Sequence, residues 1–232
     1  MRRHRWLILV LSSFIGCASV PASNKASNIR NCPKTVTVFI DKEAESDLRF
    51  LNIKIEYVLE LVNLTFSSQN IDFRYDVKNL KIKEWNRGHD SFLNNEYHPD
   101  QYKIKLLHSA DETKRTLRDN SEVGIFLTGG QWVGNGQTSL GWRVFFWSNY
   151  GRGVMWAGTA LVSDEHIDRE KKIYALAQVI AHEQGHLFGL EHVSDVNSLM
   201  HPNSSSGGGR LDNYSKKKLI RILNRERKCA AH

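Results

Sequence analysis

The sequence has few cysteines, few prolines and no long apolar run. Its 232 residues include 3 Cys and 4 Pro. Three cysteines are too few for a small disulfide scaffold, and so little proline excludes collagen-like and proline-rich chains. The apolar stretch 6–16 has eleven residues, which is too short to cross a bilayer. The rest of the composition, 41% hydrophobic and 25% charged residues, is that of an ordinary globular protein with about one domain.

The apolar stretch at the N-terminus is instead typical of a signal peptide over residues 1–16. Three arginines precede it, as in the basic region of an export signal: Arg2, Arg3 and Arg5. Gly16 and Cys17 end it, and a small residue before a cysteine resembles the end of a bacterial lipoprotein signal. That resemblance implies cleavage before Cys17, a lipid on its thiol, and an outer-membrane location. Ordinary cleavage near Ala18 or Ala22, giving a periplasmic or secreted protein, is the alternative.

Removal of the signal peptide changes what the net charge and the cysteines indicate about partners and disulfide bonds. The net charge falls from +7 to +4, because three arginines leave with residues 1–16. The remaining basic residues are scattered, so we expect no nucleic-acid partner, and membrane contact only through a lipid anchor. Cys32 and Cys229 remain near the two ends of the mature chain and are a possible disulfide. No feature of the sequence places them within reach of each other.

The mature chain reads as a tether followed by alternating strands and helices. Residues 17–33 are rich in Ser, Asn and Ala, which is typical of a flexible linker. β-Branched and alternating patterns predict strands at 35–40, 71–77 and 123–128, and further strands near 143–147 and 155–162. Helical spacing predicts a helix that Ser46 caps and that runs through Val62, a helix from Asp168, and an amphipathic helix over 212–227. This order favours an α/β or α+β fold with parallel strand pairing.

Two histidines are spaced for one face of the helix that begins at Asp168, and a glutamate lies at the flank of that face. Residues 182–186 read H-E-Q-G-H. At about 100° per residue, His182 and His186 lie about 40° apart and one turn along the axis, so both imidazoles can reach one metal ion. Glu183 flanks this face, where it can reach a water molecule without binding the metal.

A third histidine follows a glycine that can end the helix. Gly189 can adopt the left-handed conformation that turns the chain, and His192 can then return toward the first two imidazoles. Three histidines and one open position are the coordination of a catalytic Zn2+ ion rather than of a structural one. The sequence therefore predicts hydrolysis in which zinc activates water and Glu183 acts as general base.

The whole motif, H-E-x-x-H-x-x-G-x-x-H over residues 182–192, resembles the signature of the metzincin metallopeptidases. Met200, eight residues after His192 and followed by His201-Pro202, resembles the Met-turn of the matrixin branch. The resemblance implies a catalytic domain over 34–232, with an upper lobe to about residue 189 and a lower lobe over 190–232. It also implies a twisted five-stranded mixed sheet, an active-site helix and a small C-terminal subdomain. Substrate would extend an antiparallel edge strand, for which Ala157–Val162 is the candidate.

Two functions from different classes follow from these patterns. The first is a zinc endopeptidase acting on a protein or peptide substrate. The second is a non-enzymatic surface lipoprotein, an adhesin or binding module, on the same fold. Intact Glu183 favours the first, because a disabled copy would commonly lose the base. We expect one catalytic zinc ion, no second structural metal and a monomer; the sequence does not identify the substrate.

Overall fold

The structure is a computed structural model that describes residues 33–85, 114–129, 132–134, 137–139, 141–144, 151–159, 168–202 and 209–226. The predicted signal peptide and nearly all of the predicted tether lie outside these ranges, as do Cys17, Cys32 and Cys229. None of the helices in the described part of the chain is both long and apolar enough to cross a membrane. The predicted division into two lobes stays a prediction.

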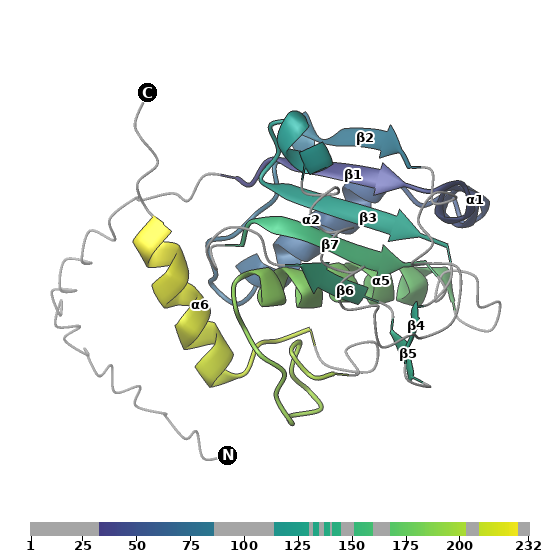
Figure 1. Cartoon of the computed structure of the whole chain (residues 1–232). Coiled ribbons are helices and arrows are strands. Elements are labelled where there is room, and N and C mark those ends of the chain that lie inside the picture. The colour runs from purple at the N-terminus through teal and green to yellow at the C-terminus, as the bar shows by residue number, and fades with distance from the viewer. Residues whose placement is uncertain are drawn as a thin grey trace, which may run out of the picture.

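A mixed sheet forms the centre of the fold (Figure 1). Its strand order is β2-β1-β3-β7-β6, with bounds β2 (Lys81–Glu84), β1 (Val36–Ile40), β3 (Val123–Thr128), β7 (Gly153–Gly158) and β6 (Gly141–Val144). The first four strands are parallel to one another, whereas β6 pairs antiparallel with β7. The short strands β4 (Trp132–Gly134) and β5 (Gln137–Ser139) form a separate antiparallel pair.

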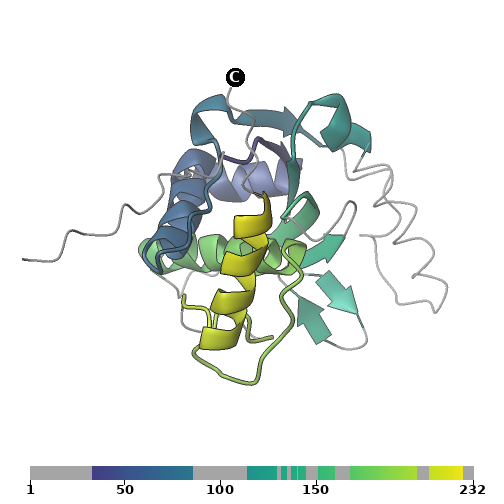
Figure 2. The same cartoon turned by 90° about the vertical axis from the view of Figure 1, so that its left-hand side faces the viewer.

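Helices cover one face of the sheet, where α2 (Ile55–Ser67) and α5 (Arg169–Leu187) lie side by side (Figure 1). Alternate strand residues such as Val38, Ile125 and Met155 point into this layer and are fully buried. α6 (Asn213–Glu226) packs against the same core through Leu219 and Leu223, and Figure 2 shows it running across the end of the molecule. The helix predicted from Asp168 and the terminal helix are confirmed.

The opposite face of the sheet is also buried, by an aromatic cluster. Phe39 and Phe126 stack with ring centroids 4.4 Å apart, and Trp85 and Trp156 pack on Phe126. Burial on both faces explains why β3 and β7 are nearly continuous apolar runs in the sequence.

The helix predicted from Ser46 to Val62 is instead two helices. The prediction was wrong about where the first helix begins and about its continuing without a break. α1 (Lys42–Phe50) begins after Asp41, whose carboxylate accepts a hydrogen bond from the Ala44 amide at 2.7 Å. α1 ends at Phe50, with Leu51 as its C-cap, and Asn52 follows with φ +50°. Asparagine tolerates this left-handed conformation better than most residues, so the chain turns there although the apolar spacing continues into α2.

The strand predicted at 71–77 was also wrong. Ile71, Phe73 and Tyr75 are buried and alternate with less buried neighbours, as the pattern indicated. The backbone of Tyr75, however, bonds to the side chain of Asn63 on α2 and forms only an isolated bridge with Lys34. A 3-10 turn, η1 (Val77–Asn79), follows, and the strand of this region is β2. All four residues of β2 are exposed, so it carries no apolar alternation that could reveal it.

The predicted cleft-lining edge strand at 157–162 is placed differently. Ala157 and Gly158 belong to β7, which lies between β3 and β6 inside the sheet, and residues 160–162 lie outside the described ranges. The antiparallel edge strand is β6, which overlaps the strand predicted near 143–147. The apolar run of β7 is explained by an interior position, because an edge strand seldom needs to be apolar on both faces.

Candidate metal centre

The helix that carries the first two histidines is α5. Asp168 caps it by accepting a hydrogen bond from the Glu170 amide at 2.9 Å, and its apolar side chains face the sheet. His182 and His186 lie one turn apart near its end and are 4% and 5% exposed. Such burial is unusual for two adjacent imidazoles unless their nitrogens have partners.

A glycine ends α5 in a Schellman arrangement. Gly189 has φ +78°, its amide donates to the His186 carbonyl at 2.8 Å, and the Leu190 amide donates to the Gly185 carbonyl at 3.0 Å. This 5→2 and 6→1 pair of hydrogen bonds is the signature of the motif. The Gly189 carbonyl also accepts a hydrogen bond from Lys218 of α6 at 2.7 Å. The turn reverses the chain and carries it back along the helix.

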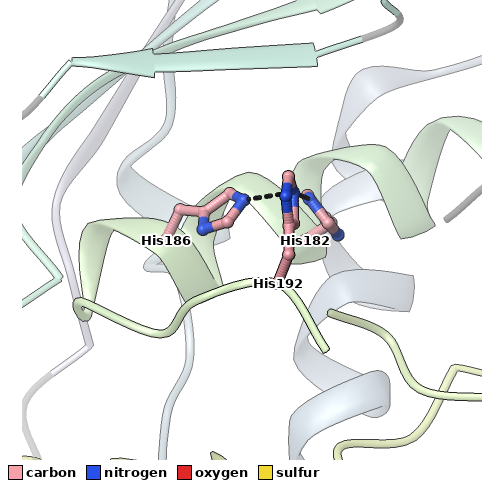
Figure 3. Close-up of side chains that lie close together, drawn as sticks. All are labelled: His182, His186 and His192. Carbon is pink, nitrogen blue, oxygen red and sulfur yellow. Dashed lines mark hydrogen bonds between the residues drawn. The ribbon is translucent and has the colours of Figure 1, made fainter. Parts of the chain in front are cut away.

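The reversed chain brings His192 to the first two histidines (Figure 3). Its Nε2 lies 3.2 Å from Nε2 of His182 and 3.0 Å from Nε2 of His186. Unlike the other two, His192 is exposed. The centre therefore has two buried imidazoles on a rigid helix and one on its solvent side.

Backbone carbonyls fix the orientation of both buried imidazoles. His182 Nδ1 lies 2.6 Å from the Leu199 carbonyl, and His186 Nδ1 lies 2.8 Å from the Leu190 carbonyl. A carbonyl oxygen only accepts, so each Nδ1 carries the proton, and in the neutral form of each ring Nε2 is the atom that presents a lone pair. This is the outer hydrogen bond that orients metal-binding histidines in proteins.

The three nitrogens fit a zinc ion. Two nitrogens that each lie about 2.0–2.1 Å from a tetrahedral zinc ion are about 3.3 Å apart, close to the 3.0 Å and 3.2 Å found here. In the neutral rings, the Nε2 lone pairs of His182 and His186 both face the Nε2 of His192. A cation between them could be bound by all three. In the described part of the chain these three histidines are the one group of three or more side chains with ligand atoms this close together.

The predicted general base follows His182 on the same helix. Glu183 is 5% exposed, and the helix turn sets its side chain about 100° from that of His182. Gln184, the next residue, is completely buried: it accepts a hydrogen bond from the Tyr75 hydroxyl at 2.7 Å and donates to the Gly151 carbonyl at 3.0 Å. Burial raises the pKa of Tyr75 well above its ordinary value of 10.0, so Tyr75 remains a neutral donor.

Met200 packs against α5 at Gly185, which lies between His182 and His186 in the helix. It is fully buried, and a Cβ placed on Gly185 would be 2.5 Å from its sulfur. The Met200 carbonyl accepts a hydrogen bond from the Val193 amide at 3.1 Å, one residue after His192. The turn around Met200 is thus in contact with both the helix and the returning chain.

Some residues of this site carry no sequence signal. The Leu190 and Leu199 carbonyls act through the backbone, which any residue type provides. Tyr75 and Gln184 are 109 positions apart and match no motif. Conversely, the cysteines predicted to carry a lipid or a disulfide lie outside the described residues.

The fold is a mixed sheet with α5 packed on one face, and three histidines converge near the end of α5. This combination is that of a metallopeptidase of the metzincin type. The predicted fold class is confirmed. The chain belongs to the matrixin family of peptidases, whose match covers residues 34–216.

Among solved structures, the fold is similar to that of archaemetzincin from Methanopyrus kandleri, with a TM-score of 0.55 and 18% identity over 83% of this chain and 96% of that one. A zinc-dependent peptidase from Methanocorpusculum labreanum (strain Z) gives a TM-score of 0.49 and 14% identity over 79% of this chain and 99% of that one. No curated protein matches the sequence.

Proposed function

We propose that the protein is a zinc-dependent endopeptidase whose ion is held by His182, His186 and His192, with Glu183 as general base. The observation that carries the proposal is the convergence of three Nε2 atoms, two of them on rings whose Nδ1 is bound to a backbone carbonyl. Three neutral nitrogens leave one position of a tetrahedral ion open, as catalysis requires.

Each residue has a defined task in this reaction. When bound, zinc supplies Lewis-acid chemistry that makes water acidic and polarises a carbonyl. Glu183 takes a proton from the attacking water and passes it to the leaving amine. The buried imidazoles hold their lone pairs in place, because the Leu190 and Leu199 carbonyls prevent their rotation.

The sheet offers a surface on which a peptide can be held. β6 is the antiparallel strand at the edge of the sheet and contacts α5. A substrate strand laid along β6 would extend the sheet with main-chain hydrogen bonds, which bind peptides with little dependence on their sequence. We propose that an extended protein or peptide segment is the substrate, that one zinc ion is bound, and that the enzyme acts as a monomer.

Cleavage of a quenched peptide library tests the proposal. The zinc-loaded protein is expected to cleave peptides internally, and a zinc chelator is expected to abolish cleavage. Glu183→Gln is expected to keep zinc but to lower kcat by at least about 100-fold, the usual contribution of a general base. Glu170→Gln is the matched control, because it makes the same change to a glutamate of α5 that lies in the first turn, far from the histidines.

Three results would count against the proposal. Zinc-loaded protein that cleaves no peptide would favour the non-enzymatic surface lipoprotein. Full turnover by Glu183→Gln would remove the assigned base. Loss of zinc from that variant would assign Glu183 to the metal rather than to proton transfer.

We also propose that the protein is exported and held at the cell envelope by a lipid on Cys17. The support is the apolar stretch after three arginines and the Gly16-Cys17 pair that ends it. Mass spectrometry of the mature N-terminus, compared between wild type and Cys17→Ala, tests this. A wild-type N-terminus at residue 19 or 23 without lipid would instead indicate a periplasmic or secreted protein.

A further inference from the structure

We propose that Gln69, at the end of α2, is a positioning residue for the metal centre. Its side-chain amide fixes the segment 209–211, this segment fixes the Leu199 backbone, and the Leu199 carbonyl orients His182. The inference rests on the proposed zinc site and adds to it a residue that lies outside the signature motif.

The first link joins Gln69 to a segment far away in the sequence. Gln69 is 8% exposed. Its Nε2 donates to the Gly209 carbonyl at 3.1 Å and to the Thr65 carbonyl at 2.7 Å, and its Oε1 accepts from the Leu211 amide at 2.7 Å. Both hydrogens of the amide are therefore used, and the oxygen is engaged as well. One side chain holds the backbone on both sides of Arg210.

The second link joins this segment to the turn before Met200. The Arg210 carbonyl accepts a hydrogen bond from the Leu199 amide at 2.6 Å, and Ser198 and Arg210 form a parallel bridge. Because Gln69 binds the peptide groups flanking Arg210, rotation of the Arg210 carbonyl would break at least one of its bonds. Leu199 is thus linked to Gln69 through a single residue.

The third link reaches the metal centre. The Leu199 carbonyl lies 2.6 Å from His182 Nδ1, and Leu199 is 1% exposed. A small displacement of this carbonyl would free the ring of His182 to rotate and would move its Nε2 away from the common point of the three histidines. Outer hydrogen bonds of this kind typically change metal affinity about 10–100-fold when they are lost.

The chain of contacts acts on one histidine and not on the other. His186 Nδ1 bonds to the Leu190 carbonyl, which belongs to the Schellman turn of α5 itself. The two hydrogen bonds that define this turn, from the Gly189 amide to His186 and from the Leu190 amide to Gly185, lie within α5 and its end, and Gln69 takes part in neither. His186 is therefore an internal control: a change that merely loosens the protein would affect both rings, whereas the proposed role affects His182 selectively.

The test uses the full mature chain with Gln69→Met, which keeps the length of the side chain and removes its hydrogen bonds. In the zinc-free protein labelled with 15N-histidine, we expect the Nδ1 proton of His182 to exchange with solvent at least tenfold faster than in wild type, and that of His186 to be unchanged. Zinc affinity, measured by competition with a chromophoric chelator, is expected to fall about tenfold or more.

Two further variants keep the test decisive. Gln69→Glu can still accept from Leu211 but cannot donate to Gly209, so its effect is expected to be intermediate, and it serves if Gln69→Met does not fold. Arg169→Met is the matched control. Arg169 also binds two backbone carbonyls, of Leu51 and Asn52 at 2.7 Å each, but at the opposite end of α5. Its loss should leave zinc affinity and both Nδ1 protons unchanged.

The outcomes separate this inference from the function on which it rests. Wild-type protein that binds no zinc would overturn the proposed function and the inference with it. Wild-type protein that binds zinc, together with Gln69 variants that are less stable but have wild-type zinc affinity and an unchanged His182 proton, would overturn the inference alone. Equal acceleration at His182 and His186 would show a general loosening and would also overturn it.

Discussion

Met200 packs directly against Gly185, in the middle of the turn of α5 that separates His182 from His186. A Cβ on Gly185 would lie 2.5 Å from the Met200 sulfur and 3.3 Å from its terminal methyl carbon. Glycine is thus favoured at this helical position by a close approach to a side chain rather than by backbone conformation. The contact holds the turn around Met200 against the part of α5 that carries the two buried histidines.

This contact predicts an unusual reversal of sign for Gly185→Ala. Alanine is favoured over glycine in a helix by about 1 kcal/mol, but overpacking the core costs about 1–3 kcal/mol. In the presence of Met200 the substitution should therefore destabilise the protein or be neutral. In a Met200→Ala background, where the sulfur is absent, the same substitution should stabilise it. Urea unfolding of the four proteins of this double-mutant cycle measures both effects, and a stabilising Gly185→Ala beside intact Met200 would contradict the proposed contact.

Gly189 allows a second prediction, on the turn that orients His186. With φ +78°, alanine at this position would cost about 1–2 kcal/mol of strain and would disturb the Leu190 carbonyl that holds His186 Nδ1. Gly189→Ala should therefore lower both the free energy of unfolding and zinc affinity. Gly189→Asn should lower them less, because asparagine tolerates the left-handed conformation. Equal effects of the two substitutions would show that backbone conformation is not the cause.

The candidate site was predictable from the sequence to the extent that it is local. His182, Glu183 and His186 share one helix, so helix geometry sets their relative positions. Gly189 predicts where that helix ends. The partners that orient the imidazoles were not predictable. Leu199 and Leu190 act through carbonyl oxygens, and Gln69 acts through a segment 140 residues away, which no periodicity can reveal.

The same distinction applies to the fold. The strands β1, β3 and β7 were predictable because they are buried and apolar on both faces. β2 was missed because an exposed edge strand has no apolar pattern. The segment 71–77 was mistaken for a strand because alternate side chains in it are buried, yet the backbone of Tyr75 bonds to the side chain of Asn63. Burial of side chains determines the apolar pattern of a segment, whereas the partners of its backbone hydrogen bonds determine its secondary structure.

Tyr75 is expected to make the protein sensitive to alkaline pH. Its buried hydroxyl donates to Gln184, and burial raises its pKa in the folded state above the value of 10.0. Above about pH 10 the unfolded chain releases this proton while the folded chain retains it, so stability falls as the pH rises. Below that pH the contribution is fully present.

Tyr75→Phe tests whether stability falls as the pH rises because of this tyrosine. At pH 8 the variant should be less stable than wild type by about 1–3 kcal/mol, because the buried Gln184 oxygen loses its donor. As the pH is raised from 9 toward 11, the difference should narrow, since only wild type loses stability through this group. Thermal unfolding followed by circular dichroism across this range provides the measurement. A difference that is constant with pH would show that Tyr75 does not titrate with unfolding.

Asp212 is expected to contribute stability that is lost in acid. Its carboxylate precedes α6 and accepts hydrogen bonds from the amides of Tyr214 and Ser215 at 2.9 Å and 3.0 Å. Partial burial raises its pKa, but hydrogen bonds from Ser215 and Tyr214 outweigh this effect and hold the pKa below its ordinary value of 3.8. A carboxylate with a lowered pKa in the folded state stabilises the protein above the unfolded value, and this stabilisation disappears as the pH falls through the folded value.

Two substitutions separate the cap from its charge. Asp212→Ala removes both and should cost about 1 kcal/mol at neutral pH, as for other helix caps. Asp212→Asn keeps a good capping side chain and should cost less at neutral pH. Because asparagine does not titrate, the gap between wild type and Asp212→Asn should close as the pH falls below about 4, where the carboxylate of the unfolded chain becomes protonated. Urea unfolding at pH 7 and at pH 3 measures the gap, and a gap that widens in acid would mean that the lowered pKa of Asp212 has no counterpart in stability.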